Sequence, residues 1–334
     1  MTFVEGLPKA ELHVHHVGSA SMRTVAELAG LHAGRPDVPT DPQARARSSR
    51  FTDFGHFIEV YLAVVDLLRT PEDLWTLTYD VARDLAAQNV RYVELTCTPY
   101  TSIAVGIPAE AYCETLEDAR RRAEADFGLT MQWIFDIPGE SGVPAADVTL
   151  DTALRLRPDG LVGFGLGGPE IGVPRPQFAP HFQQAIAAGL RSVPHAGEST
   201  GPQTIWDSIN ELGAERIGHG ISAAQDPALM EYLAENGITL EVCPTSNVRT
   251  RSVPSLAEHP LPMLVAAGVP VTINSDDPPM FATTLNQEYE VAAELLDLDD
   301  HGIADLARAS VRASFADEAT KTAILTEIDT YVTP

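Results

Sequence analysis

The stretch RIGHGISAAQDPALMEYLAENGITLEVC, residues 216–243, contains the repeating unit of the fold. Two short runs that we expect to be strands, 216–218 and 238–243, flank a helical segment that opens with Asp226 and Pro227 and ends at Gly237. Asp is a good N-cap, Pro suits the first helical position, and Gly suits the C-cap. The second run is almost continuously apolar, as in a strand covered on both faces. This strand–helix–strand order predicts a parallel sheet.

The same alternation extends over the whole chain of 334 residues. A further helix start is visible at Thr70, which precedes Pro71 and two acidic residues. We therefore expect an α/β fold, a single (β/α)₈ barrel over residues 1–334, because this length needs no second domain. The eight expected strands are residues 11–15, 90–96, 131–135, 161–166, 191–195, 216–218, 238–243 and 269–274.

The segment between the first two expected strands, residues 18–89, is too long for one connecting helix. We expect it to form a helical insertion over the mouth of the barrel. Phe51, Phe54, Phe57 and Tyr61 lie at roughly helical spacing within it. These aromatic side chains either pack in the core or cover a bound substrate, and the sequence leaves both interpretations open.

Composition and charge narrow the possible partners. Lys and Arg number 22 against 47 Asp and Glu, so the formal net charge is −25. Such a chain repels phosphate backbones and anionic lipid surfaces, which argues against nucleic acid and membranes and leaves a small molecule. The N-terminal residues show no signal peptide, and no apolar run has the roughly 18 residues of a membrane span. Cys97, Cys113 and Cys243 lack CxxC spacing, so we expect a reduced, cytoplasmic protein.

Four candidate metal ligands fall at the ends of expected strands. His13 and His15 close the first strand, and residues i and i+2 of a strand share one face, here the barrel interior. His195 ends the fifth strand and Asp276 follows the eighth. Barrel enzymes build their sites at these carboxyl ends. Two histidines in an HxH pattern are a weak signal alone, but the full set predicts one Zn²⁺ per chain with an open position for water.

Other polar residues near the same strand ends would suit hydrolysis. Glu198 lies three residues beyond His195, His219 follows the sixth strand, and Asp277 directly follows Asp276. Adjacent carboxylates repel each other unless a metal or a donor separates their roles. Each residue also has a purely structural explanation, such as an exposed loop acid or a buried histidine with a hydrogen-bond partner. Gly168, after the fourth strand, would let a ligand approach the backbone, although a tight turn explains it equally well.

Taken together, the motifs resemble the adenosine deaminase family of metal-dependent amidohydrolases. The resemblance runs from about Leu7 to past Phe281, nearly the whole chain. The motifs that carry it are, in chain order, LPKAELHVH, VRYVEL, PHAGES, RIGHG, CPTSN and INSDDP.

This resemblance implies hydrolytic removal of the 6-amino group of a purine nucleoside. It implies that Glu198 protonates N1 of the purine and that His219 orients and deprotonates the attacking water. It also implies that Asp277 contacts N7 and that the Gly168 backbone contacts N3. The implied zinc ligands are His13, His15, His195 and Asp276.

The first motif departs from the HxHLDG pattern of the family. The chain has His16 and Val17 after His15, and the Asp that the family uses to hold the ribose 5′-hydroxyl is missing. An unpaired buried hydroxyl costs about 1–3 kcal/mol, so adenosine is expected to be a poor substrate. The variant is similar to the branch that deaminates 6-aminodeoxyfutalosine, an intermediate of the futalosine route to menaquinone with a carboxyphenyl ketone beyond the 5′ carbon. Val17 and the ring of His16 would suit that substituent.

Two further departures concern substrate contacts. Arg251 replaces a common Gly after CPTSN, and it or Arg249 would pair with the substrate benzoate, unless both are solvated loop residues. In the fourth-strand motif, Gly165 and Pro169 stand where acids are usual, which weakens the expected contact through Gly168.

The sequence leaves several alternative functions open. The main alternative is deamination of adenosine or of a 5′-modified adenosine such as methylthioadenosine, and another is deamination of adenine. A catalytically inactive relative that binds purines is a third, although all the expected catalytic residues are retained. Amide hydrolysis by the same barrel is a fourth, because a fold does not determine a reaction.

Overall fold

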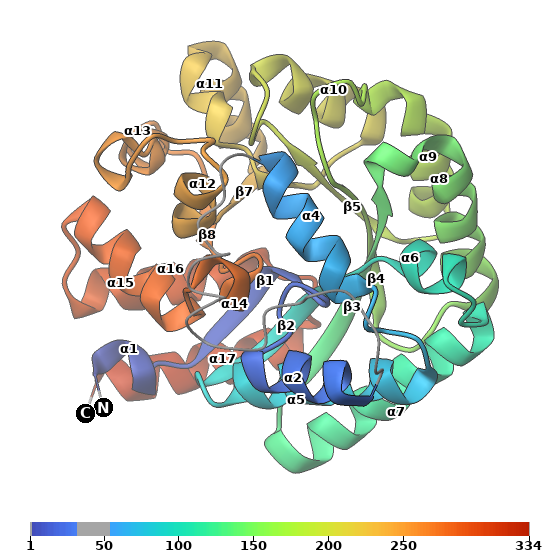
Figure 1. Ribbon diagram of the computed structural model, residues 1–334. Helices are drawn as coiled ribbons and strands as arrows, with labels where there is room; N and C mark the ends of the chain where they lie inside the picture. Colours follow the sequence, from blue (N-terminus) through green and yellow to red (C-terminus); the bar gives the residue numbers. More distant parts are fainter. Residues whose placement is uncertain (1, 32–53, 334) are drawn as a thin grey trace.

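The computed structural model describes residues 2–31 and 54–333, in which eight parallel strands form a barrel surrounded by helices (Figure 1). Strand order around the barrel follows the sequence. The last strand meets the first through a bridge between Val14 and Asp276, where the Asp276 N–H donates to the His13 carbonyl at 3.0 Å. All eight expected strands are confirmed. They are β1 (Lys9–His15), β2 (Val90–Cys97), β3 (Thr130–Pro138), β4 (Leu161–Gly167), β5 (Arg191–Ala196), β6 (Arg216–His219), β7 (Thr239–Val242) and β8 (Val271–Ile273).

Helices follow the strands and cover the outside of the barrel (Figure 1). The expected helix starts are confirmed: the Thr70 side chain accepts from the Asp73 N–H, and the Asp226 side chain accepts from the Ala228 N–H. Gly237 ends its helix with a φ of 66°. The helices are α1 (Phe3–Gly6), α2 (Met22–Leu31), α4 (Phe54–Val65), α5 (Pro71–Ala86), α6 (Pro99–Ala104), α7 (Ala109–Phe127), α8 (Gly142–Asp151), α9 (Ala179–Ala187), α10 (Pro202–Leu212), α11 (Pro227–Asn236), α12 (Pro244–Arg249), α13 (Leu261–Ala266), α14 (Pro278–Phe281), α15 (Leu285–Leu296), α16 (Asp300–Ala313) and α17 (Glu318–Val332).

The expected helical insertion is confirmed over the part that the structure describes. Helix α4 lies across the barrel opening (Figure 1). Phe57 is buried, and its ring centroid lies 5.0 Å from that of Phe281, while Phe57 and Tyr61 also line the central pocket. The two interpretations of these aromatic residues therefore do not exclude each other. Phe51 lies outside the described residues.

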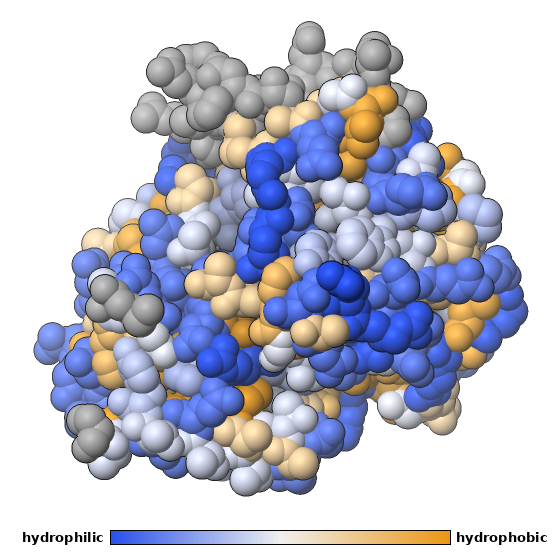
Figure 2. All heavy atoms as spheres, turned by 90° about the horizontal axis from the view of Figure 1, so that it is seen from below, coloured by the Kyte–Doolittle hydropathy of each residue, from blue (hydrophilic) through white to orange (hydrophobic). Residues whose placement is uncertain are grey.

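Most large apolar side chains are buried between the strands and helices. Figure 2 shows a face on which hydrophilic residues predominate and hydrophobic residues are scattered. Cys97, Cys113 and Cys243 are buried and free. Among residues 2–31 and 54–333, no helix is long and apolar enough to cross a membrane.

Candidate active site

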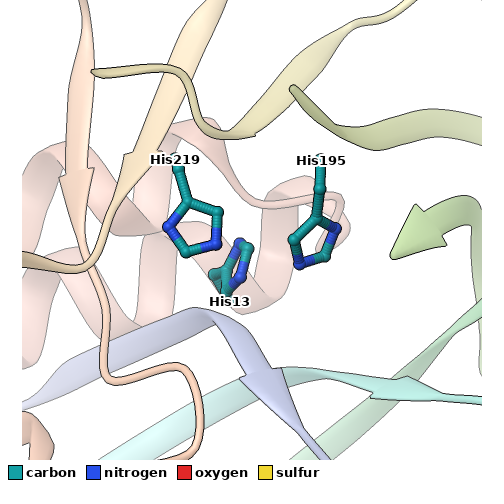
Figure 3. A group of neighbouring side chains, drawn as sticks. All are labelled: His13, His195 and His219. Atoms are coloured by element: carbon teal, nitrogen blue, oxygen red, sulfur yellow. The ribbon is translucent and has the colours of Figure 1, made fainter. Parts of the chain in front are cut away.

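The four expected metal ligands converge at the carboxyl ends of the strands. His15 Nε2 lies 3.1 Å from His195 Nε2 and 3.4 Å from Asp276 Oδ1, and His13 Nε2 lies 3.7 Å from the same oxygen. The side chains of His13, His195 and His219 point toward one another (Figure 3). His219 and Asp276 adopt left-handed backbone conformations, with φ of 61° and 63°. Strained backbone of this kind is concentrated at functional sites.

The chemistry of these donors fits a divalent cation. Burial lowers the pKa of His15 to about 4 and that of His195 well below its usual value, so both rings are neutral and offer lone pairs. His13 Nε2 is buried without a hydrogen-bond partner among the described residues. Burial also disfavours charge on His13, yet the nearby carboxylates of Asp276 and Glu241 outweigh this and raise its pKa to about 10. The site therefore stabilises positive charge, which a metal ion would supply.

A buried chain of charges under the site holds His13 in place. The Nδ1–H of His13 donates to Glu241 Oε2 at 3.0 Å, and Glu241 Oε1 accepts from Arg216 Nε at 2.6 Å. Arg216 also pairs with Glu94, and its guanidinium lies 3.8 Å from the ring centroid of Phe315. A carboxylate bonded to the far nitrogen of a histidine fixes its tautomer and orientation, a common support for metal ligands. Nε2 of His13 is thereby directed into the site.

Replacing Arg216 with Met is expected to reduce the free energy of unfolding by about 3–5 kcal/mol, because Glu94 and Glu241 would remain buried without their cation. Urea denaturation measures this change. The matched control is Arg191→Met, which breaks the exposed pair with Glu215 and a 5.6 Å contact of the guanidinium with the Phe315 ring, and should cost about 0–1 kcal/mol. Equal effects of the two substitutions would contradict the stabilising role of the buried network.

Glu198 is held on the loop after β5 by a second carboxylate. Glu170 accepts from the N–H groups of Gly197 at 3.0 Å and Glu198 at 2.8 Å. The Glu198 Oε1 atom accepts from Thr250 Oγ1 at 3.0 Å. Burial raises the pKa of Glu198 to about 8, and the charges of Asp276 and Glu170 add to this effect. Glu198 is therefore protonated at neutral pH and suited to donate a proton.

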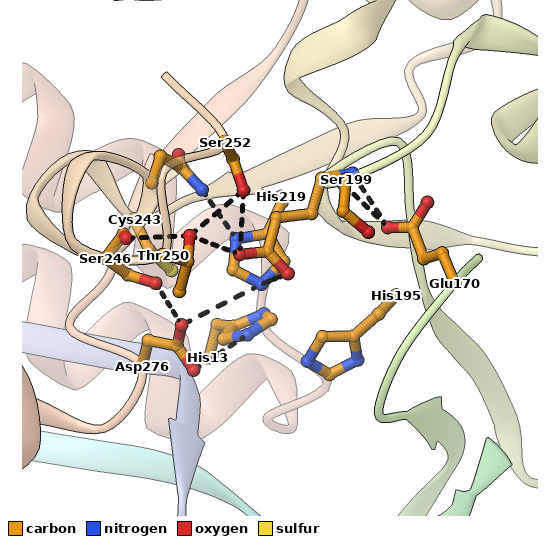
Figure 4. Close-up of polar contacts among 12 residues, drawn as sticks. His13, Glu170, His195, Ser199, His219, Cys243, Ser246, Thr250, Ser252 and Asp276 are labelled. Atoms are coloured by element: carbon orange, nitrogen blue, oxygen red, sulfur yellow. Dashed lines mark hydrogen bonds and ion pairs between the residues drawn. The ribbon is translucent and has the colours of Figure 1, made fainter. Parts of the chain in front are cut away.

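The two adjacent aspartates after β8 have different environments. Asp276 lies on the histidine side, and its Oδ2 accepts from Ser246 Oγ at 2.5 Å (Figure 4). Asp277 Oδ1 is buried without a hydrogen-bond partner among the described residues. Burial and the neighbouring Asp276 raise the pKa of Asp277 well above its usual value, so this carboxyl can donate a hydrogen bond. Gly18 is required beside it, because a Cβ there would lie 1.3 Å from Asp277 Oδ1.

One pocket contains most of these groups. Residues of α4 form part of its wall, and strand-end residues form the rest. The expected site residues that line it are His15, Gly168, His195, Glu198, His219, Asp276 and Asp277.

The pocket also contains acids that the sequence did not single out. Asp136 is buried at the end of β3, and its Oδ1 accepts from Thr98 Oγ1 at 2.6 Å. Its carboxylate occupies space left by glycines on β4, since a Cβ on Gly167 would lie 2.7 Å from Asp136 Oδ2. Glu140 lines the same wall. Asp136 on β3 thus lies beside Gly165 on β4, a position where the family usually has an acid. The missing acid at Gly165 was the sequence signal that could have indicated Asp136.

Four expected substrate contacts lie outside the pocket lining. His16 Nε2 donates to Thr78 Oγ1 on α5 at 2.9 Å, and Val17 is buried in the apolar core. Arg251 is exposed on a neighbouring groove, and Arg249 is partly buried. The structure does not bring these residues to the pocket, and their roles stay predictions.

The barrel and its cluster of imidazoles and carboxylates at the strand ends are typical of the amidohydrolase class of enzymes. The family is more specific: the chain belongs to the adenosine deaminase family, whose sequence model matches residues 8–331. The resemblance seen in the motifs is confirmed, and so is the expected enzyme class, a hydrolytic deaminase acting on C–N bonds.

Three known proteins are closely similar over nearly the full length. An aminodeoxyfutalosine deaminase from Streptomyces avermitilis is 64% identical over 334 residues, which cover 99% of this chain and 92% of the relative. The structure of an adenine deaminase from Arthrobacter aurescens has a TM-score of 0.93 at 32% identity, covering 98% of this chain and all of that one. An amidohydrolase from Burkholderia ambifaria, solved with bound Zn, has a TM-score of 0.89 at 26% identity. The match covers 99% of this chain and 93% of that one.

Proposed function

We propose that this enzyme deaminates 6-aminodeoxyfutalosine to futalosine and ammonia, as a cytoplasmic step of menaquinone biosynthesis. The observation that carries the proposal is the 64% identity with the aminodeoxyfutalosine deaminase of Streptomyces avermitilis. Adenine deaminases are less similar; that of Cupriavidus necator is 38% identical. The pocket supports the proposal because it holds a protonated acid, a second donor and three of the four candidate metal ligands together.

We infer that one Zn²⁺ would be held by His13, His15, His195 and Asp276. Three imidazoles and one carboxylate are a donor set that this metal prefers. When bound, the metal would lower the pKa of water so that a nucleophile is available near neutral pH.

The residues of the chain bind and polarise the purine. Glu198 donates its proton to N1 and so neutralises the charge that develops on the ring during addition at C6. Asp277, held protonated by burial, donates to the N7 acceptor, and the backbone N–H of Gly168 donates to N3. Water adds at C6, ammonia leaves, and the 6-oxopurine remains.

We infer that the part of the pocket lined by Asp136 and Glu140 receives the sugar and its 5′ substituent. N3 of a purine is close to the sugar on N9, so a base held at Gly168 directs its sugar toward Glu140 and Asp136. A Cβ on Gly168 would lie 2.3 Å from Glu140 Oε2, which places that carboxyl beside the expected N3 contact. We infer that these carboxyls accept hydrogen bonds from sugar hydroxyls. Apolar side chains of α4, including Phe57 and Ile58, would cover the aryl group.

A substrate panel tests this function. Purified enzyme is expected to deaminate aminodeoxyfutalosine with a kcat/KM about 5- to 150-fold above that for adenosine, as the loss of 1–3 kcal/mol at the 5′-hydroxyl implies. Methylthioadenosine and adenine complete the panel, and the loss of purine absorbance measures turnover. Faster turnover of adenosine or methylthioadenosine would overturn the substrate assignment.

Adenine is the second candidate substrate, because the adenine deaminase from Arthrobacter aurescens has nearly the same fold. Running the panel on Asp136→Asn separates the two functions. If Asp136 binds the sugar, the substitution lowers kcat/KM for nucleosides and leaves that for adenine unchanged. Equal losses for all substrates would exclude sugar recognition by Asp136.

A further inference from the structure

Asn247, from the CPTSN motif, lies between two buried histidines. Its amide nitrogen lies 3.1 Å from His219 Nδ1, and its amide oxygen lies 3.2 Å from His259 Nε2. The backbone N–H of Leu261, at the start of α13, donates to His259 Nδ1 at 3.1 Å. All three side chains are at most 5% exposed, so water does not compete for these bonds.

The backbone N–H of Leu261 determines every proton position along this series of hydrogen bonds. Because His259 Nδ1 accepts from Leu261, the neutral ring carries its proton on Nε2. Burial lowers the pKa of His259 to about 4, which keeps the ring neutral. His259 Nε2 therefore donates to the amide oxygen of Asn247, whose amide nitrogen donates to His219 Nδ1. His219 must then carry its proton on Nε2.

The reversed orientation of the Asn247 amide is excluded by the same bonds. It would direct the amide N–H groups at the Nε2–H of His259, so two donors would face each other in a buried place. The other end is consistent with the assignment, since the His219 Nε2–H lies near a carboxyl oxygen of Glu198 and one of Asp276. Glu198 Oε2 lies 3.6 Å from it and Asp276 Oδ2 lies 3.8 Å away.

We propose that Asn247 and His259 are positioning residues that lock His219 as the Nε2–H tautomer. His219 then donates a hydrogen bond to the attacking oxygen, and the proton that this oxygen loses passes to the Asp276 carboxylate, whose Oδ2 lies 3.8 Å from His219 Nε2. This differs from the role that the family resemblance implied for His219. The fixed tautomer also distinguishes His219 from the metal ligands, although the centroid of its ring lies 4.7 Å from that of His13. A nitrogen that carries a proton cannot bind a metal. The catalytic consequence rests on the proposed deamination, whereas the tautomer does not.

The tautomer is tested directly by ¹⁵N NMR of histidine-labelled wild-type enzyme, with and without Zn²⁺. We expect His219 to show a protonated Nε2 and an unprotonated Nδ1 in both forms, with signals assigned by their loss in His219→Gln. A protonated Nδ1, or a shift of Nε2 to a metal-bound position with zinc, would overturn the proposal. This result is independent of which substrate the enzyme uses.

Two substitutions at one position separate tautomer control from packing. Asn247→Asp keeps the shape but accepts from His219 Nδ1, which places a proton on Nδ1 and abolishes the wild-type tautomer, and kcat should fall on the order of 10²- to 10³-fold with little change in KM. Asn247→Ala leaves both tautomers available and should lose less, about tenfold. A purely structural role predicts the reverse order, because alanine creates a cavity where the amide group was. A greater loss in the alanine variant would therefore refute the lock.

The His259 end of this chain of hydrogen bonds offers a matched pair of variants. His259→Gln retains a donor for the Asn247 oxygen, whereas His259→Leu removes it. We expect the glutamine variant to keep kcat within a few-fold of wild type and the leucine variant to lose at least tenfold. Zinc content, measured by mass spectrometry, should remain at one per chain in both. Equal activities would contradict the role of His259.

Discussion

Replacing His15 with alanine is expected to remove the bound metal and to lower kcat on the order of 10⁴-fold, because the water nucleophile would lose the acidification that the cation supplies. His15 Nε2 lies within 3.4 Å of both His195 Nε2 and an Asp276 oxygen, so one donor of a compact set would be lost. Metal content after dialysis and steady-state kinetics with the best substrate of the panel measure the two effects.

The neighbouring histidine provides the control. His16→Ala removes an imidazole of the same type one residue away, but that ring bonds to Thr78 and lies outside the metal set. This variant should keep stoichiometric zinc whatever its activity. Loss of metal in the His16 variant, or full zinc content in the His15 variant, would show that the ligand set is wrong.

The barrel and its reactive groups were predictable because they depend on local patterns. Strand alternation places His13 and His15 on the interior face, and parallel strands bring their carboxyl ends to one side of the barrel. The bridge from Val14 to Asp276 then brings the last strand to the first. None of these steps requires knowledge of a particular side-chain contact.

The supporting residues were not predictable in the same way, because they depend on contacts between distant segments. Glu241 reaches His13 from 228 positions away, and Glu170 reaches the loop of Glu198 from 28 positions away. The neighbours of these acids in the sequence do not indicate which distant segment each acid contacts. Only the assembled barrel shows that each one accepts hydrogen bonds from a group in the site.

The residues after β1 show a place where strand alternation and the family motif point in different directions. His16 follows His15 by one position, so alternation directs its side chain to the opposite face, and the structure places it against α5. Alternation alone therefore argued against a pocket position for His16. The segment differs from the usual motif of the family, but a difference in sequence does not by itself indicate a contact with substrate.

Replacing Glu198 with glutamine is expected to lower kcat by about 10²- to 10⁴-fold while leaving zinc content unchanged, because the amide keeps the shape of the side chain but has no proton to give to N1. The pH dependence distinguishes this from a packing defect. Since burial raises the pKa of Glu198 to about 8, the active protonated form of the wild type is present below that pH and is lost above it. Wild-type kcat should therefore fall as pH rises through about 8, and the glutamine variant should lack this decline. A glutamine variant within tenfold of wild type, or one that retains the decline, would mean that another group protonates the purine.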